Sequence, residues 1–236
     1  GLQSSAVLDG DHFILNGQKV WSSNAQLAQF GILMARTDAE LPKHKGITFF
    51  LLDMALAGVE VRPIKQMTGE SEFCEVFFSD VIVPSDAVLG EVNGGWAVAM
   101  AVLQDERGGA GASGVISLRR RLEHMIQGAG EVSPLQIDGL IEILNRGKAL
   151  QSLMERRGGD PHIAPIAKLM NSELSYDEAQ LDASLHGAHS MLTSASIQAL
   201  LYSPGMRIAG GSSEIQRNII GERLLGLPRE PQIASD

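Results

Sequence analysis

The residues best suited to ligand chemistry stand near the C-terminal end of the chain. Gly210 and Gly211 precede two serines and a glutamate at the expected start of a helix. Glycines in that position let a ligand approach backbone N–H groups at the positive end of the helix dipole. The same pattern is also typical of a plain glycine turn before a capped helix, with Ser213 and Gln216 forming a capping box and Ile215 buried. These residues alone leave both interpretations open.

Three other groups of residues have side chains that could take part in chemistry. The run Trp21-Ser22-Ser23-Asn24 offers an aromatic ring beside hydroxyls, although a tryptophan among strands is most simply a core residue. The run Arg119-Arg120-Arg121 is most simply a solvated helix face, with phosphate contact as the alternative. Cys74 is the single cysteine, which excludes an internal disulfide framework and a Cys-rich metal site. We expect this thiol to be buried and inert, and we expect no metal.

Composition places the chain among ordinary globular proteins. It has 236 residues, of which 44% are hydrophobic and 20% are charged. The net charge of −9 provides no general attraction to nucleic acid. No apolar run approaches the roughly 18 residues that cross a bilayer, and no secretory pattern opens the chain, so we expect no membrane partner and a cytoplasmic location. The first residue is Gly1 rather than Met, which indicates processing or a fragment.

The elements that must position these residues fall into two classes. Residues 1–90 read as short strands bounded by turns, including a hairpin around Asp9-Gly10 and a second turn at Asn16-Gly17. Residues 91–236 read as helices with apolar residues at helical spacing. The predicted fold class is therefore α+β, with a small antiparallel β-barrel or sandwich domain followed by an α-helical up-down bundle.

Several motifs in order resemble the acyl-CoA dehydrogenase family. The stretch Ile-Ala-Gly-Gly-Ser-Ser-Glu-Ile-Gln-Arg-Asn-Ile-Ile-Gly-Glu-Arg-Leu-Leu-Gly-Leu-Pro-Arg-Glu, residues 208–230, is similar to the C-terminal signature of that family. The run from Trp21 to Asn24 is similar to its flavin-contacting strand, and the segments 46–51, 77–84 and 94–96 follow in the family's order. The resemblance implies a middle β-domain at 1–90 and a C-terminal four-helix-bundle domain at 91–236, without the family's N-terminal helical domain.

The resemblance also implies a reaction and its cofactor. Family members desaturate an acyl-CoA thioester between its α and β carbons, so a carboxylate removes the α proton while FAD accepts the β hydride. Carried over residue by residue, the resemblance assigns the FAD contacts to four residues: Trp21, Ser23, Ser212 and Glu214. It assigns the substrate contacts to Gly210, Gly211 and Arg107, with the Gly210 N–H beside the thioester oxygen.

The catalytic base departs from the commoner family pattern. Most members carry the base as a Glu at the position that is Gly210 in this chain. A minority, including isovaleryl- and long-chain-type enzymes, carry it on the first bundle helix before an Arg, and here that pair is Glu106-Arg107. We therefore predict Glu106 as the base, with a solvated Glu-Arg pair as the alternative. Asp105 projects about 100° away on a helix and is a poorer candidate.

Two rival functions accompany the dehydrogenase prediction. The family's Arg-x-x-Phe-Gly segment, whose Arg binds the FAD pyrophosphate, is absent, and an arginine from 119–121 would have to replace it. That absence favours a catalytically silent subunit of a heteromeric dehydrogenase, and a flavin monooxygenase of the same fold is the second rival. For a working enzyme the resemblance implies β-oxidation-type lipid metabolism, an electron-transfer flavoprotein as electron acceptor, and a homo-oligomer or a paralogous subunit.

Overall fold

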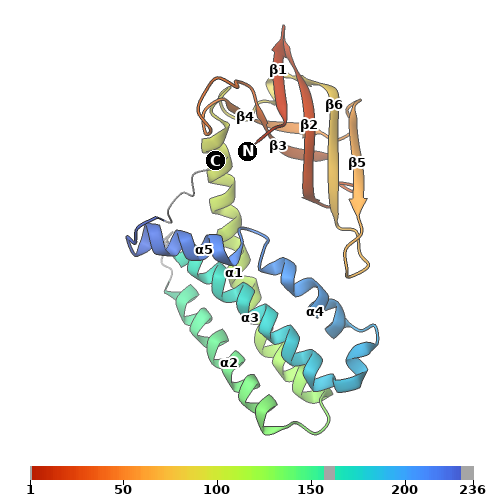
Figure 1. The fold of residues 1–236 in the computed structure, drawn as a ribbon, viewed down its shortest axis with the longest axis vertical. Helices are drawn as coiled ribbons and strands as arrows, with labels where there is room; N and C mark the ends of the chain where they lie inside the picture. Colours follow the sequence, from red (N-terminus) through yellow and green to blue (C-terminus); the bar gives the residue numbers. More distant parts are fainter. Residues whose placement is uncertain (1, 157–162, 230–236) are drawn as a thin grey trace, which may run out of the picture. The chain divides into compact units, whose positions relative to one another are not determined.

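The structure is a computed structural model that describes residues 2–156 and 163–229, with the side chains of 104–119 and 128 excepted. It divides into two compact units, residues 1–104 and 105–236. Helix α1, Gly95–Gly128, begins in the first unit and continues into the second (Figure 1). Among the described residues, no helix combines the length and apolar character needed to cross a bilayer.

The first unit is built on one mixed sheet. Its strands are β1 (Ser5–Asp9), β2 (His12–Ser23), β3 (Phe30–Arg36), β4 (Ile47–Asp53), β5 (Val59–Ile64) and β6 (Phe73–Pro84). In the described chain their order is β4-β3-β1-β2-β6-β5. All neighbouring pairs are antiparallel except β1 and β3, which meet in parallel at Ser5 and Arg36. The α+β class is confirmed, although the sheet does not close into a barrel.

The predicted hairpin is present, and the predicted second turn is wrong. Gly10 has φ 63° and joins β1 to β2. At Asn16-Gly17, however, β2 continues as strand, because the Asn16 side chain bonds across to β6 instead of turning the chain. Its Nδ2 donates to Asp80 Oδ1 at 2.9 Å, and the Asp80 N–H donates to Asn16 Oδ1 at 2.9 Å. Gly17 is needed for close approach, since a Cβ there would lie 2.7 Å from Ser4 Cα.

The core of the first unit follows the alternation of its strands. Phe13 and Phe50 meet edge to face, with ring centroids 5.2 Å apart, and both are buried. Cys74 is fully buried, as predicted, and its Sγ–H donates to Gln26 Oε1 at 2.8 Å. The thiol is therefore a packed core group with a hydrogen-bond partner.

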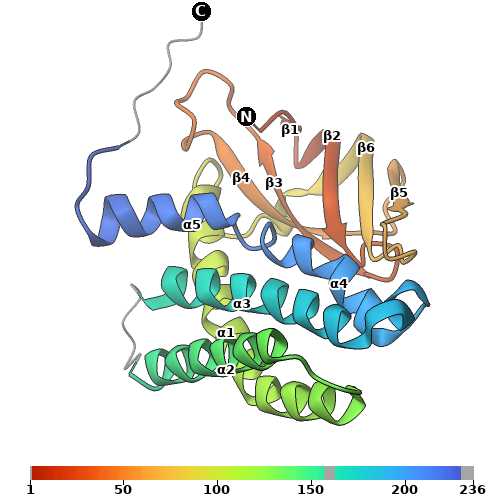
Figure 2. The ribbon, with the colours of Figure 1, turned by 60° about the horizontal axis from the view of Figure 1, so that its bottom comes forward.

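The second unit is helical. After α1 come α2 (Pro134–Glu155), α3 (Ile163–His186), the 3-10 turn η2 (Gly187–Met191), α4 (Ala195–Met206), α5 (Ser213–Ile219) and the π-helical turn η3 (Ile220–Leu224). Ser133 and Gln136 form a full capping box at the start of α2. Helix α3 contacts α2, α4 and α5, and Figures 1 and 2 both show α2 lying alongside it. Their apolar faces share a core that includes Leu150 and Leu174.

Arg121 differs from the other expectation for the run 119–121, which was a helix face paired only with solvent. Its side chain is 43% exposed, but the guanidinium is paired: Nε donates to Glu178 Oε1 at 2.5 Å and Nη2 donates to Glu178 Oε2 at 2.8 Å. Glu178 lies on α3 with its side chain almost fully buried. The pair therefore joins α1 to α3 within the helical unit, with the guanidinium partly open to solvent. Neighbouring Arg120 is also exposed.

The start of α5 differs from the prediction in its capping box and in the burial of Ile215. The N-cap is Ser212 rather than Ser213, and its hydroxyl accepts the Ile215 N–H. Gln216 does not reach back to the cap; its Nε2 donates to the Gly210 carbonyl at 3.1 Å instead. Within this chain Ile215 is 51% exposed, whereas Ser213 and Gln216 are buried. The helix thus turns a polar face inward, because the glycine carbonyls and charged groups of α3 lie there.

Candidate functional site

Trp21 sits in a bulge of β2. Lys19 pairs with Val76 and Ser22 with Cys74, so Val20 and Trp21 together face the single residue between those partners. Trp21 has φ 63°, a conformation that bulky residues rarely adopt. Its side chain is 62% exposed within this chain and lies edge to face with Phe73, with ring centroids 6.1 Å apart. The core interpretation of Trp21 is therefore wrong, and the bulge presents the indole outward.

Ser23 ends the same strand. It is exposed, and in the described part of the chain its hydroxyl has no hydrogen-bond partner. The backbone then turns at Asn24, which has φ 51° and donates its N–H to the Glu72 carbonyl at 2.6 Å. The turn holds the end of β2 in place, so both the ring of Trp21 and the hydroxyl of Ser23 are available to a ligand.

The glycine pair before α5 forms a second candidate surface. Gly210 has φ 66° and Gly211 has φ 99°. A Cβ on Gly211 would lie 2.6 Å from Gln216 Nε2, so a side chain is excluded there. Among the described residues, a Cβ on Gly210 would meet nothing nearer than Lys168 Cε at 3.9 Å, so these residues leave open space at the position where most of the family carries a Glu.

Charged groups that the sequence did not single out surround this turn. Glu173 on α3 lies 3.2 Å from an Arg207 guanidinium nitrogen and 3.4 Å from one of Arg217. Burial would raise the pKa of Glu173, but the nearby Ser213 hydroxyl and the two guanidinium groups outweigh it and hold the pKa below its ordinary value. Burial also lowers the pKa of Lys168, whose Nζ donates to the Met206 carbonyl. Only contact across the helices reveals this cluster, because its members are far apart in sequence.

Glu214 is exposed at the first turn of α5. Its own backbone N–H and the Ser212 hydroxyl lower the pKa of its carboxyl. The carboxylate is therefore ionised at neutral pH and free to accept hydrogen bonds from a ligand. The Ser212 hydroxyl, in contrast, already caps the helix, so only its remaining hydrogen-bonding capacity is available.

The predicted site residues thus fall into separate sets. Trp21 and Ser23 lie together in the first unit, and the residues from Gly210 to Glu214 lie together in the second. The side chains of Glu106 and Arg107 lie outside the described residues. Among the described residues, no group of three or more His, Cys, Asp or Glu side chains could hold a metal ion.

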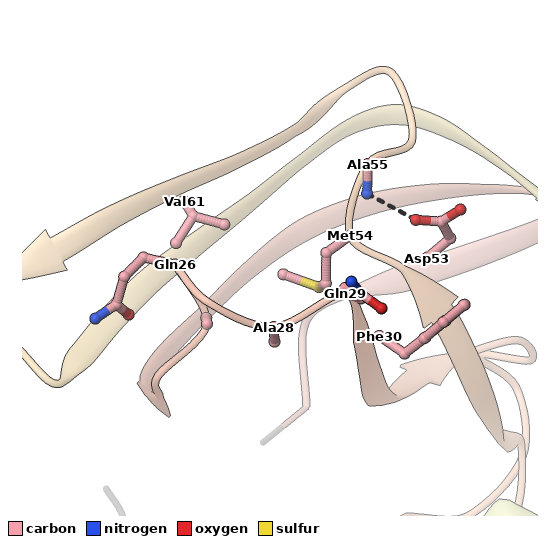
Figure 3. A pocket seen from close by; sticks show the side chains of 9 residues that line it. Gln26, Ala28, Gln29, Phe30, Asp53, Met54, Ala55 and Val61 are labelled. Carbon is pink, nitrogen blue, oxygen red and sulfur yellow. Dashed lines mark hydrogen bonds between the residues drawn. The ribbon is translucent and has the colours of Figure 1, made fainter.

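The first unit also carries hollows that the sequence did not indicate. One of about 600 Å³ lies between the β2–β3 connection and the end of β4, and Figure 3 shows Gln26, Gln29 and Phe30 on one side of it. The carboxylate of Asp53 is engaged at its rim, since Oδ1 accepts the Ala55 N–H at 2.9 Å. A second hollow of about 340 Å³ shares some of these walls and reaches toward Ser23 and Lys19.

Comparison with known proteins decides the family. The model described as acyl-CoA dehydrogenase, middle domain, matches residues 1–81, and the one described as acyl-CoA dehydrogenase, C-terminal domain, matches residues 147–225. The chain belongs to the acyl-CoA dehydrogenase family. Its two compact units correspond in order to the family's middle and C-terminal domains.

Relatives and solved structures of acyl-CoA dehydrogenases resemble the chain over nearly its whole length. Acyl-CoA dehydrogenase FadE34 of Mycobacterium tuberculosis is 36% identical over 97% of the chain and 33% of the relative. Acyl-CoA dehydrogenase IpdE1 of the same organism is 35% identical over 96% of the chain and 63% of the relative. The solved Tcur3481-Tcur3483 steroid ACAD is 25% identical with a TM-score of 0.86, over 98% of this chain and 65% of that one. The chain therefore spans less than two thirds of each of these proteins.

A heteromeric structure is also among the similar ones. The ChsE4-ChsE5 complex from Mycobacterium tuberculosis is 26% identical to the chain with a TM-score of 0.83, over 98% of this chain and 65% of that one. As its name says, that protein contains two kinds of subunit.

Proposed function

We propose that the protein is an FAD-dependent acyl-CoA dehydrogenase that desaturates an acyl-CoA thioester, with Glu106 as the base for the α proton. The observation that carries the proposal is the open space at Gly210. Among the described side chains, none comes nearer than 3.9 Å to a Cβ placed on Gly210, the position that usually holds the family's base, so a carboxylate from another element has room to reach it. Glu106 on α1 is the carboxylate at the family's alternative position.

The described residues fit a flavin. Stacking needs an exposed aromatic ring, which Trp21 supplies, and a hydrogen bond needs an uncommitted hydroxyl, which Ser23 supplies. The ionised Glu214 and the cap residue Ser212 would contact the same group from the second unit. When bound, FAD would take the two electrons and the hydrogen that leave the β carbon as hydride.

The remaining steps belong to the protein. Glu106 would accept the α proton, the backbone N–H of Gly210 would donate to the thioester oxygen, and Gly211 and Arg107 would help to hold the substrate. A domain of residues 1–90 would provide the flavin-contacting strand, and one of residues 91–236 the base. We further propose a cytoplasmic homo-oligomer or mixed oligomer that passes its electrons to an electron-transfer flavoprotein during acyl-CoA breakdown.

The experiment compares Glu106→Gln with Asp105→Asn after both have been loaded with FAD. Bleaching of the flavin absorbance by a panel of acyl-CoAs is followed under anaerobic conditions. Loss of a general base lowers the bleaching rate by about 10²–10⁴-fold, which is the result expected for Glu106→Gln. Asp105→Asn should bleach at about the wild-type rate. Bleaching that is equally fast in Glu106→Gln and wild type would show that the base is elsewhere.

One observation favours a silent subunit as the second candidate. Arg121, one of the arginines that would have to replace the missing pyrophosphate-binding Arg, is already paired with Glu178 of α3. The chain would then stabilise an active paralogue rather than turn over substrate. Purified wild-type protein that takes up no FAD alone, but does so after mixing with a paralogous subunit, would favour this candidate.

A further inference from the structure

A closed ring of hydrogen bonds joins the sheet of the first unit to the start of α1. The Asn93 N–H donates to Thr48 Oγ1 at 2.9 Å, and Thr37 Oγ1 donates to Asn93 Oδ1 at 2.6 Å. The two hydroxyl oxygens lie 2.7 Å apart. Because the Thr37 proton is already given to Asn93, the Thr48 hydroxyl is the donor between them. Each group therefore donates once and accepts once, and hydrogen bonds connected in this way strengthen one another.

The members of the ring come from three segments. Thr48 lies on β4 and is fully buried, Thr37 directly follows β3, and Asn93 lies two residues before α1. Asn93 has φ 66°, a left-handed conformation that asparagine adopts more readily than most residues. Both of its bonds in the ring hold this turn, so the ring fixes the place where the chain enters α1.

The segment that leads into α1 lies along the backbone of β4, which is at one end of the strand order in the described chain. It is joined there at three points: the bridge of Val88 with Phe50, the Leu89 N–H that donates to the Phe49 carbonyl at 2.8 Å, and the bridge of Gly94 with Ile47. A Cβ on Gly95 would lie 2.6 Å from the Phe49 backbone nitrogen. Helix α1 therefore begins directly against the edge of the sheet.

The β3–β4 connection makes a further contact with the helix. The ring of His44 lies against that of Trp96, the second residue of α1, with centroids 4.4 Å apart. Arg36 holds the connection in place, since its Nη1 donates to the Lys45 carbonyl at 3.0 Å and its Nη2 to the Lys43 carbonyl at 3.2 Å. The start of α1 is thus held at its backbone by the ring and at a side chain by the connection.

A fixed start matters because α1 is long. Glu106 follows Gly95 by eleven residues on the same helix, which is about three turns or about 16 Å. A change of about 4° in the direction of the helix at its start moves a residue at that distance by about 1 Å. Misplacement of a reacting group by about 1 Å can lower a rate by about a hundredfold. The direction given to α1 at the sheet is therefore a catalytic variable.

We propose that Thr48, through its ring with Thr37 and Asn93, is a positioning residue for the base. The ring sets the direction in which α1 leaves the sheet, and with it the place of Glu106. In this role Thr48 acts through the helix and need not touch substrate or flavin. The inference rests on the proposed function, because it takes Glu106 as the base.

The test is Thr48→Val, which keeps the branched shape of the side chain and removes the hydroxyl. The substrate is the acyl-CoA of the panel that bleaches the wild-type flavin fastest. The kcat counted per bound FAD should fall by about tenfold or more, while KM and the Kd for FAD stay within about twofold of wild type. Thr48→Ser restores the hydroxyl and should return kcat to within about twofold of wild type.

Thr68→Val is the matched control. In the described chain the Thr68 hydroxyl serves its own loop, where it accepts the Glu70 N–H at 3.3 Å. The same substitution there should leave kcat unchanged. An equal loss of kcat in Thr68→Val would show that the effect is not specific to the ring, and would overturn the inference.

A second measurement needs neither FAD nor substrate. Amide hydrogen exchange at Ala99, which is buried near the start of α1, should be about tenfold faster in Thr48→Val than in wild type. Exchange at Val81, in the buried part of β6, should stay the same. Equal acceleration at both residues would show a general loss of stability instead of a loosened α1, and would overturn the inference.

Asn93→Gly opens the ring at another point and keeps the backbone N–H, and glycine suits φ 66°. It should lower kcat in the same way, and it decides the question if Thr48→Val does not fold. Unchanged kcat in these variants, or a change carried by KM or the Kd for FAD, would overturn the inference alone if Glu106→Gln is slow. Wild-type bleaching by Glu106→Gln would overturn the proposed function, and the inference with it.

Discussion

At the scale of single residues, the candidate site depends on polar groups turned inward. Gln216 is fully buried and binds the Gly210 carbonyl, while Glu173 gathers Arg207 and Arg217 behind the same turn. The Gln216 side chain and the Glu173 ion pairs thus support Gly210 and Gly211, which both have positive φ. The two glycines have no side chains of their own that could do so. The geometry of the proposed substrate contact therefore depends on a carboxylate that would never touch the substrate.

Replacing Glu173 with Gln should destabilise the helical unit in a pH-dependent way. Because the folded pKa of Glu173 is lowered, its contribution is present above the ordinary value of 4.5 and is lost as pH falls through the folded pKa. We expect a loss of about 2 kcal/mol in the free energy of unfolding at pH 7, shrinking toward zero in acid. Urea unfolding of wild type and variant at pH 7 and in acid measures this difference in the free energy of unfolding.

Glu142→Gln is the matched control, since its carboxylate is exposed and only 3.7 Å from Arg146 as an i,i+4 pair. Its effect should stay below about 0.5 kcal/mol at either pH. A loss for Glu173→Gln that is the same in acid as at neutral pH would show that packing, rather than charge, is responsible.

At the scale of elements, α3 is the helix on which the second unit is organised. It contacts α2, α4 and α5, and its Glu178 holds Arg121 of α1 through two hydrogen bonds. The sequence showed three consecutive arginines without indicating which of them pairs with Glu178 of α3. Helical periodicity turns neighbouring side chains about 100° apart, so only one of two adjacent arginines can reach the same partner.

Arg121→Met should therefore cost far more stability than Arg120→Met. Removing Arg121 leaves the buried Glu178 carboxylate without its guanidinium, for which we expect a loss of about 3 kcal/mol. Arg120 is exposed, and its replacement should change the free energy of unfolding by less than about 0.5 kcal/mol. Thermal or urea unfolding of the two variants decides the point. Similar losses in both would contradict the structural role of the pair.

At the scale of the whole molecule, the proposed flavin contacts are divided between the two compact units. Saturating FAD should therefore slow amide exchange in both, at Phe13 in the first unit and at Leu150 in the second. At a hundredfold excess over Kd, ligand binding adds about 2.7 kcal/mol to the stability of the structure that binds it. Exchange measured with and without FAD tests this. Protection confined to one unit would show that the other contributes no contact.

The sequence predicted the classes of element well, because periodicity and turn residues are local signals. The Asp9-Gly10 hairpin, the strand-to-helix change and the buried Cys74 all followed from such signals. The predicted turn at Asn16 failed because its side chain bonds to a residue 64 positions away, and local propensity carries no such information. The cluster around Glu173 was missed for the same reason, because Arg207 and Arg217 reach it across the helices.

The bulge at Trp21 limits which insertions and deletions the β2–β6 strand pair can accept. Between Leu15 and Gly17 the β2–β6 register shifts by one residue, and between Lys19 and Ser22 it shifts back. The two irregularities cancel, so both ends of the strand pair share one phase although the middle does not. Deletion of Trp21 alone would turn the side chains of Ser22 and Ser23 to the opposite faces of the sheet. Deletion of both Trp21 and Asp80 would give the strand pair a single uniform register. Across related sequences, insertions and deletions in these two strands should accordingly appear in matched pairs.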